Sequence, residues 1–268
     1  MVDPLPYFRS TADPDYWSNL WAAQSLENLL AVANVSPLTR FLERFLRPGM
    51  RALEGGCGLG QYVLYFSRKG VSISGIDYSS DAVSTHLSLY PDSDIHHGEL
   101  EQLRFGDQSF DAYLSIGVIE HYEDRGTRIL TEARRVLAED GLVLLSTPYL
   151  NASRRLLRRR IERQQRMVSE AGGTFYQFAF DESTLDGILR AAGFEPVARA
   201  YYDAGRGLRD LSELLIAPPP RAAANRSGFS PRSYRARPRI VRAVMRSRPS
   251  LWLFAHMQIV CARKIRDQ

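Results

Sequence analysis

Two kinds of hydrophobic pattern alternate along the middle of the chain, and their order predicts the fold. From residue 48 onward, short apolar runs typical of buried strands (MRALEG, VSISGID, FDAYLSI and LVLLSTP) alternate with segments of helical spacing (QYVLYFSRK, SSDAVSTHLSLY and GTRILTEARRVLAED). A weaker strand, DIHHG, stands before FDAYLSI. Strands that alternate with helices are typical of a parallel sheet covered on both faces. We therefore expect an α/β, Rossmann-like, doubly wound sheet.

The two ends of the chain depart from this alternation. Residues 16–33 carry apolar residues at near-helical spacing, which predicts one amphipathic helix, and LTRFLERFL predicts a second helix that ends at Pro48-Gly49. After residue 151, a strongly basic helix is expected at 154–170, followed by GGTFYQFAF as an aromatic, extended segment. STLDGILRAAGF then predicts a helix, and EPVARAYY and HMQIVCARK predict two strands.

The segment LEGGCGLGQ, at 53–61, joins the first of the alternating strands to its helix. Gly56, Gly58 and Gly60 let the backbone turn sharply and approach a ligand beside the free N–H groups of a helix N-terminus. The spacing is not the G-x-G-x-x-G of dinucleotide-binding loops, and no Gly-Lys-Ser/Thr follows as in a Walker loop. A carboxylate at Glu54 disfavours a pyrophosphate and favours a ligand with cationic groups.

Further acids specify the rest of this ligand. Asp77 ends the second strand, where a carboxylate can accept hydrogen bonds from both ribose hydroxyls, and Tyr78 follows it in the same predicted site. After the third strand, Glu99 is placed to accept from an adenine amino group and Leu100 to form an apolar wall. These residues together predict a cationic nucleoside. The alternative is another nucleotide-binding fold in which the glycines only pack a helix against a strand.

In order and spacing, these motifs resemble the class I S-adenosylmethionine-dependent methyltransferases, in the small-molecule branch that includes quinone-biosynthesis enzymes. The family's acid followed by G-x-G-x-G matches the loop at 54–60, and its ribose acid matches Asp77. Its usual Gly-Asp adenine segment is Gly98-Glu99 here, a conservative departure. The resemblance covers residues 45–150 strongly, and 176–203 and 256–264 more weakly.

The resemblance implies a seven-stranded sheet whose last strand runs antiparallel, with S-adenosylmethionine as the methyl donor. It places Ser115 and Ile116 beside the methionine moiety. The expected divisions are an N-terminal helical cap at 1–47, an S-adenosylmethionine-binding core at 48–150, a basic and aromatic insertion near the acceptor pocket at 151–180, and the C-terminal part of the core at 181–268 with a basic arm at 204–255.

Methyl transfer from a sulfonium is an in-line displacement, so the protein must hold the acceptor close, aligned and dry. His121 follows the fourth strand and is the candidate base or acceptor-orienting residue, although a histidine that only orders the loop is an alternative. Glu120 is expected to support that loop. Trp17 is expected to cover the cofactor, as in the aromatic N-terminal helix of such enzymes. The candidate lining of the acceptor pocket is Tyr16, Trp21, Tyr149, Tyr176 and Phe178, which indicates an apolar or planar acceptor unless these residues are ordinary core.

Composition and missing motifs separate the classes of acceptor. The 268 residues carry a net charge of +5, with arginine tracts at 154–166 and 221–248 that could contact RNA phosphates or an anionic membrane surface, or simply be solvated. SIGV stands where a base-modifying amino-methyltransferase would have Asn/Asp-Pro-Pro-Tyr/Phe. Cys57 and Cys261, expected to be reduced thiols, lie outside the place of a cytosine-C5 nucleophile and form no metal pattern.

The expected function is therefore methyl transfer to a small-molecule acceptor, with nucleic acid disfavoured. The alternatives are an RNA methyltransferase that uses the arginine-rich segments and a membrane-surface lipid or quinone methyltransferase that docks through its basic arm. A cytoplasmic protein is expected, at most peripheral to a membrane, because no export signal and no apolar run of membrane-spanning length is found.

Overall fold

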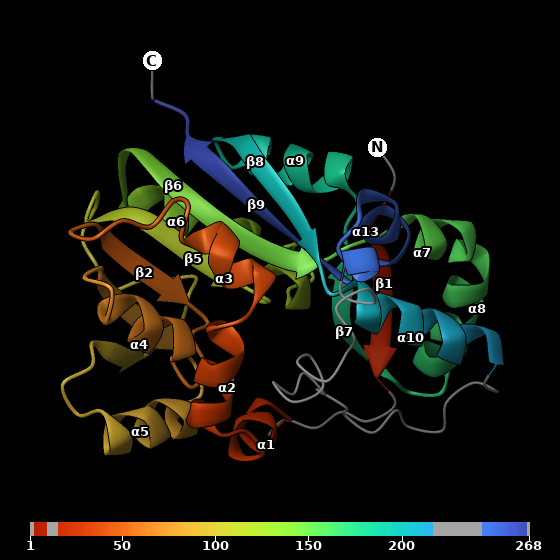
Figure 1. The fold of residues 1–268 in the computed structure, drawn as a ribbon, viewed down its shortest axis with the longest axis horizontal. Helices are drawn as coiled ribbons and strands as arrows, with labels where there is room; N and C mark the ends of the chain where they lie inside the picture. Colours follow the sequence, from red (N-terminus) through yellow and green to blue (C-terminus); the bar gives the residue numbers. More distant parts are fainter. Residues whose placement is uncertain (1–2, 10–15, 217–242, 267–268) are drawn as a thin grey trace.

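A seven-stranded sheet forms the centre of the protein (Figure 1), in the strand order β4-β3-β2-β5-β6-β9-β8. The computed structural model describes residues 3–9, 16–216 and 243–266. β9 is antiparallel to both of its neighbours, and the remaining neighbouring pairs are parallel, which confirms the doubly wound sheet with an antiparallel last strand. The strands of this sheet are β2 (Arg51–Gly55), β3 (Ser72–Asp77), β4 (Ile95–His97), β5 (Phe110–Ile116), β6 (Leu137–Pro148), β8 (Phe194–Tyr202) and β9 (Met257–Lys264).

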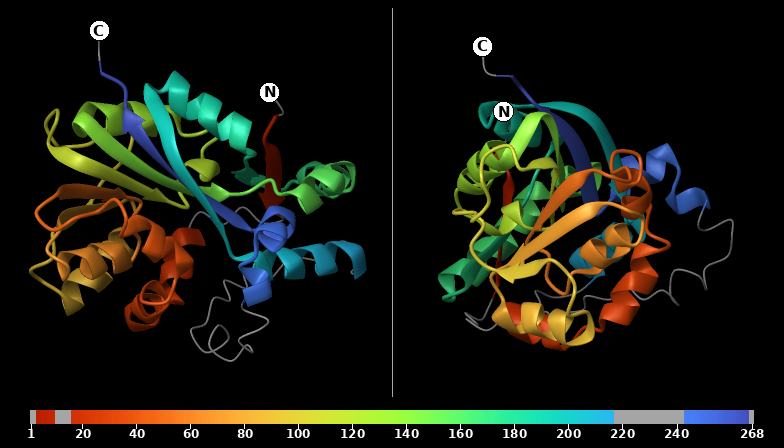
Figure 2. Two further views of the ribbon diagram at one scale, coloured as in Figure 1. Left: turned by 45° about the horizontal axis from the view of Figure 1, so that its top comes forward. Right: turned by 90° about the vertical axis from the view of Figure 1, so that its left-hand side faces the viewer.

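Helices pack on both faces of the sheet, and each face has its own hydrophobic core (Figure 2). α6 shows why such a helix forms and docks: its buried residues, Ile129, Leu130, Ala133 and Val136, share one face while charged residues fill the other. α6 and α9 contribute to one core, and α3 and α4 to the other. The bounds are α3 (Pro37–Leu42), α4 (Gln61–Ser67), α5 (Ser80–Leu89), α6 (Thr127–Val136) and α9 (Glu182–Ala191).

The expected N-terminal helix at 16–33 is two helices, α1 (Tyr16–Ala22) and α2 (Leu26–Ala33). The break has a local cause, because Ser25 adopts an extended conformation and its side chain accepts from the backbone N–H of Asn28, as an N-cap does. α1 buries none of its residues fully. It therefore lies over the core as a separate short cover.

A second group of elements stands beyond the carboxyl ends of the parallel strands (Figure 1). Its centre is a two-stranded antiparallel ribbon of β1 and β7, and sequence reasoning missed β1. The basic segment 154–170 is not one helix, because the chain leaves helical geometry at Leu157 and starts again. The elements are β1 (Leu5–Arg9), α7 (Ala152–Leu156), α8 (Arg158–Glu170), β7 (Thr174–Ala179), α10 (Ala204–Ile216) and α13 (Arg248–Phe254).

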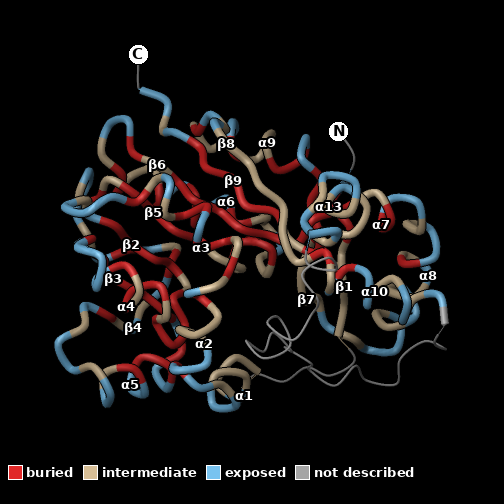
Figure 3. Tube along the Cα trace, viewed as in Figure 1, coloured by how far each residue is buried: buried red, intermediate tan, exposed pale blue. Residues whose placement is uncertain are grey.

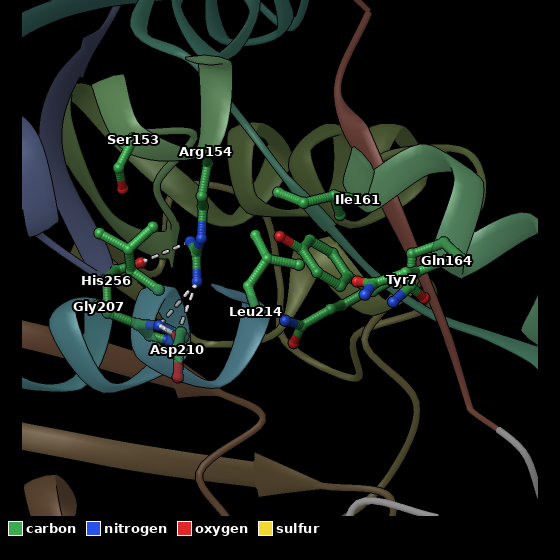
Figure 4. Close-up of a pocket in the computed structure, with 12 residues that line it drawn as sticks. Tyr7, Ser153, Arg154, Ile161, Gln164, Gly207, Asp210, Leu214 and His256 are labelled. Carbon is green, nitrogen blue, oxygen red and sulfur yellow. Dashed lines mark hydrogen bonds and ion pairs between the residues drawn. The ribbon is translucent and has the colours of Figure 1, made fainter. Parts of the chain in front are cut away.

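Buried positions are concentrated in the sheet and where it meets this second group (Figure 3), and Arg154 is one of them. Its guanidinium donates to the carbonyl of Tyr149 at 2.7 Å and to Oδ2 of Asp210 at 3.2 Å, and it lies 2.8 Å from Nδ1 of His256. These groups meet at one end of a cavity of about 170 Å³, with Tyr7 across from them (Figure 4). The side chain of Arg154 therefore ties α7 to α10 and to the chain just before β9, and is not solvated.

Candidate active site

The glycine loop turns between β2 and α4 at the carboxyl end of the sheet. Gly58 has a φ of +53°, a conformation that other residues rarely adopt, and its N–H donates to Oδ2 of Asp77 at 2.7 Å. A Cβ on Gly58 would lie 2.3 Å from the ring of Trp21. The bare backbone is thus required twice, by the turn and by the close approach of an aromatic ring from α1.

Asp77 is the anchor of this loop at the end of β3. It is 4% exposed, and its second oxygen, Oδ1, accepts from the N–H of Ser79 at 2.9 Å. Burial raises the pKa of Asp77, against the opposing effect of hydrogen bonds from Ser79 and Gly58. Each carboxylate oxygen keeps a further acceptor position, because one N–H uses only one lone pair. Asp77 can therefore hold the loop and accept from a ligand at the same time.

Glu54, on β2, is 1% exposed, and its Oε2 has no hydrogen-bond partner among the described residues. Burial, and then the nearby charge of Asp77, raises the pKa of Glu54 well above its usual range. The hydroxyl of Ser115, at the end of β5, is likewise buried without a partner in the described part of the chain. Buried acceptors without donors are costly, so these two polar groups are complementary to a ligand that brings a cation and a hydrogen-bond donor.

Four aromatic side chains form what we call the acceptor cluster: Tyr16 and Trp17 from α1, His121 from the 3-10 helix η1 (Ile119–His121), and Tyr176 from β7. Nδ1 of His121 lies 2.6 Å from the carbonyl oxygen of Tyr176. Because a carbonyl only accepts, Nδ1 carries the proton and Nε2 keeps its lone pair. Burial is the main cause that lowers the pKa of His121 to about 4, so the ring is neutral near pH 7.

A β-bulge helps to bring Tyr176 into this cluster. Tyr7 pairs with Gln177 and Phe8 pairs with Phe175, which leaves Tyr176 as an extra residue on β7. Bulges of this kind re-aim a side chain and are common beside active sites. The Tyr176 ring lies 5.0 Å from the His121 ring, whereas Gln177 lines the cavity of Figure 4.

The contacts revise three of the assignments made from the sequence. Trp21, expected in the acceptor pocket, lies on Gly58 of the glycine loop, whereas Trp17, expected over the cofactor, packs on His121 with ring centroids 4.7 Å apart. Tyr149 turns toward α9, where its hydroxyl donates to Glu182 at 3.0 Å.

Phe178 is likewise placed differently from the expectation, because it packs on the rings of Phe175 and Phe180 at the α6 and α9 core. Apolar packing there explains its aromatic character without a ligand. Tyr149 and Phe178 thus have partners away from His121, and their place in the acceptor pocket stays a prediction.

Comparison with known proteins bears on this geometry. Residues 53–145 match the family model for a methyltransferase domain. The chain is 36% identical over 168 residues to a probable S-adenosylmethionine-dependent methyltransferase of Mycolicibacterium smegmatis, an alignment that covers 61% of this chain and 59% of that protein. Residues 53–145 thus form a methyltransferase domain of the class I, S-adenosylmethionine-dependent type.

The names of other relatives state different kinds of substrate. The chain is 31% identical over 105 residues to a ubiquinone biosynthesis O-methyltransferase of Maricaulis maris (37% of this chain, 41% of that one). It is 34% identical over 101 residues to a probable tRNA methyltransferase 9B of Mus musculus (37% and 22%). The chain thus spans less than two thirds of the length of each of these relatives.

The fold of this methyltransferase also recurs in solved structures. A SAM-dependent methyltransferase from Methanosarcina mazei superposes with a TM-score of 0.60 at 18% identity, covering 87% of this chain and 99% of that one. At that identity the likeness concerns the fold alone. In open α/β sheets in general, ligands bind at the carboxyl ends of the strands.

The residues around the glycine loop fit S-adenosylmethionine as the methyl donor. The unpartnered Oε2 of Glu54 suits the donor's ammonium, and Asp77 suits its ribose. Leu100 is buried, as an apolar wall for the adenine would be, and Ser115 offers a buried hydroxyl. The further residues expected around the adenine and methionine moieties, Ile116 (half-buried), Tyr78 and Glu99 (both exposed), stay predictions.

Sequence reasoning missed two features near the acceptor cluster. Glu120 was expected only to support its loop, but it is 2% exposed with Oε2 unpartnered in the described part of the chain, and burial raises its pKa to about 8. The hydroxyl of Tyr202, at the end of β8, lies 2.6 Å from the Oγ of Ser146. Burial is the main cause that raises the pKa of Tyr202, and the nearby Glu120 contributes to it. The position of Glu120 directly before His121 was the one signal available.

The remaining expectations concern the surface. No helix among the described residues has the length and apolarity to cross a membrane. Residues 217–242 of the basic arm lie outside the described residues, and at the other end of the arm α13 exposes 57% of Trp252. Docking of the arm on a membrane surface therefore stays a prediction.

Proposed function

We propose that this methyltransferase transfers the methyl group of S-adenosylmethionine to a small-molecule acceptor held against the acceptor cluster. One arrangement carries the proposal: α1 lies on the glycine loop through Trp21 and on His121 through Trp17. A single short helix thus covers both the expected donor site and the neighbouring aromatic site. A covered, aromatic site suits a compact acceptor better than a polymer.

The residues of the chain act mainly by positioning. The bound donor supplies an electrophilic methyl group on a sulfonium. Trp17 and Tyr176 exclude water and present ring faces to a planar or apolar acceptor, and Nε2 of His121 offers a lone pair to any donor group that such an acceptor carries. With a pKa of about 4, His121 is a weak base, so orienting the acceptor is its favoured role.

The experiment is a transfer assay with isotopically labelled S-adenosylmethionine against a panel of small acceptors. Turnover of one of them that barely changes with salt is the expected result. A chain that binds the donor but transfers its methyl group only to RNA would overturn the small-molecule assignment.

A second candidate, RNA methylation, is favoured by the surface of α8. Arg159, Arg163 and Arg166 line one exposed crevice, and one relative is named a probable tRNA methyltransferase. Phosphate contacts of this kind make binding fall steeply as salt rises. A tRNA titration at several salt concentrations, repeated with the three arginines replaced by Gln, separates this candidate from the first.

A further inference from the structure

Arg9, the last residue of β1, stacks on the acceptor cluster. Its guanidinium carbon lies 3.3 Å from the ring centroid of Tyr16 and 4.8 Å from that of Tyr176. Its charge is also close enough to His121 to help lower the pKa of that ring. The half-buried Arg9 therefore places a fixed positive charge beside the group proposed to orient the acceptor.

The two ring contacts leave part of the hydrogen-bonding edge of Arg9 available, because the rings of Tyr16 and Tyr176 are perpendicular (89°) and the guanidinium stacks flat on the nearer one. Contact with an aromatic ring uses the flat face of a guanidinium, whereas its five N–H donors lie in the plane. Over residues 3–9, 16–216 and 243–266, no hydrogen bond or ion pair of this side chain accompanies its two ring contacts. A half-buried guanidinium with unused donors is complementary to a carboxylate, which it binds through two parallel N–H···O bonds.

Other acceptor chemistries fit these contacts less well. An ammonium acceptor would use the ring faces of Tyr16 and Tyr176, but the cation of Arg9 already occupies them and would repel it. A phenol, whose pKa is about 10, would need a base to remove its proton, and His121 is a weak one. The nearby acid, Glu120, is largely protonated at neutral pH because burial raises its pKa to about 8, so it does not oppose an anion strongly.

We propose that the acceptor carries a carboxylate group, which Arg9 binds through its N–H edge and holds for methylation on oxygen. This inference rests on the proposed methyl-transfer function. A lone pair of the carboxylate oxygen forms the new O–CH₃ bond while the S–CH₃ bond breaks with its electron pair going to sulfur. The carboxylate becomes a neutral methyl ester, the sulfonium becomes a thioether, and no proton has to leave.

The test uses benzoate, benzamide and phenol as planar probes, because the first two have nearly the same shape and differ in charge. Each is titrated calorimetrically into the full chain saturated with S-adenosylhomocysteine. We expect benzoate to bind at least about tenfold more tightly than benzamide, the scale of one charge-assisted hydrogen bond. Arg9→Gln should abolish that preference and leave the affinity for S-adenosylhomocysteine unchanged.

Two variants make the outcome specific. Arg160→Gln removes the same charge from an exposed site on α8 and should keep the full preference for benzoate. Arg9→Lys keeps the charge without the planar fork, so its preference should be reduced but present, and it serves if the Gln variant does not fold.

Three results would contradict the inference: equal binding of benzoate and benzamide by the wild type, stronger binding of phenol, or a full preference in Arg9→Gln. A chain that fails to bind S-adenosylhomocysteine at all would instead contradict the proposed function.

Discussion

Replacing Glu54 with Gln should stabilise the free protein and weaken cofactor binding, two effects of opposite sign from one carboxylate. The carboxyl is 1% exposed, one of its oxygens has no partner within the described chain, and burial raises its pKa well above the usual 4.5. The folded protein therefore holds this proton at pH values where the unfolded chain has lost it. Glutamine has nearly the same shape and no proton to lose.

The magnitude follows from proton linkage. Between pH 4.5 and the raised pKa of Glu54, the folded state binds about one proton more than the unfolded state at this residue. The free energy of unfolding then falls by about 1.4 kcal/mol per pH unit. The Glu54→Gln variant has no such decrease in the free energy of unfolding. The stability difference in favour of the variant should be near zero at pH 4.5 and grow as the pH rises.

The binding effect has a separate cause. A buried carboxylate paired with the donor's ammonium makes charge-assisted hydrogen bonds, each worth about 1.5–3 kcal/mol. Losing one of them should weaken S-adenosylhomocysteine at least about tenfold. The assays are denaturant unfolding from pH 4.5 to 8 and calorimetry at pH 7.5.

Glu43→Gln is the matched control. Its hydrogen bond from Lys69 lowers the pKa of Glu43, so this residue adds stability above its unfolded pKa and loses it as the pH falls through its folded pKa. Because that loss lies below about pH 4.5, the stability difference between the control and the wild type should stay nearly constant from pH 4.5 to 8, small because the pair is partly exposed, and binding should be normal. A Glu54 variant whose stability runs parallel to the wild type at all pH values, with unchanged binding, would refute the reasoning.

Three further changes test other parts of the site. Asp77→Asn should weaken S-adenosylhomocysteine at least about tenfold, and unchanged calorimetric affinity would reject Asp77 as the ribose acceptor. His121→Ala should lower turnover far more than donor affinity. Because the pKa of His121 is about 4, the wild-type rate should show no inflection from this residue between pH 6 and 8. An inflection in the wild-type pH profile that the variant loses would contradict the neutral state of His121. Arg154→Ala should lower the free energy of unfolding by about 2 kcal/mol, less than for a fully buried pair because the side chain of Asp210 is 37% exposed. Replacing the exposed Arg155 with Ala should be near neutral. Equal effects of the two changes in denaturant unfolding would refute the stabilising role of the Arg154–Asp210 pair.

Local patterns predicted most of the sheet, because its strands and helices carry their own signals. The run LVLLSTP is buried almost throughout and forms the C-terminal part of β6. The left-handed backbone of Gly58, in contrast, is explained only by its neighbours in the loop. β1 carried no such signal, since Pro4 precedes it, Pro6 interrupts it, and its partner, β7, lies far along the chain. Pairing of that kind depends on tertiary contacts that no local window contains.

The same distinction divides the site. Glu54 lies on β2 directly before the glycine loop and Asp77 is the last residue of β3, so sequence order was enough to place both in one candidate site. Arg154 could not be separated from the solvated arginines around it, because Asp210, the acid that pairs with it, lies on another helix. The orientation of Tyr176 depends on a bulge between two distant strands, and the hydrogen bond of Tyr149 depends on Glu182 of another helix.

Calorimetric titration of the wild-type chain with S-adenosylmethionine and S-adenosylhomocysteine tests the central claim most directly. The loop acids and the glycine turn predict that both ligands bind at one site per chain, and that NAD, whose pyrophosphate would face Glu54, does not. A chain that binds NAD and neither of the two nucleosides would contradict the account.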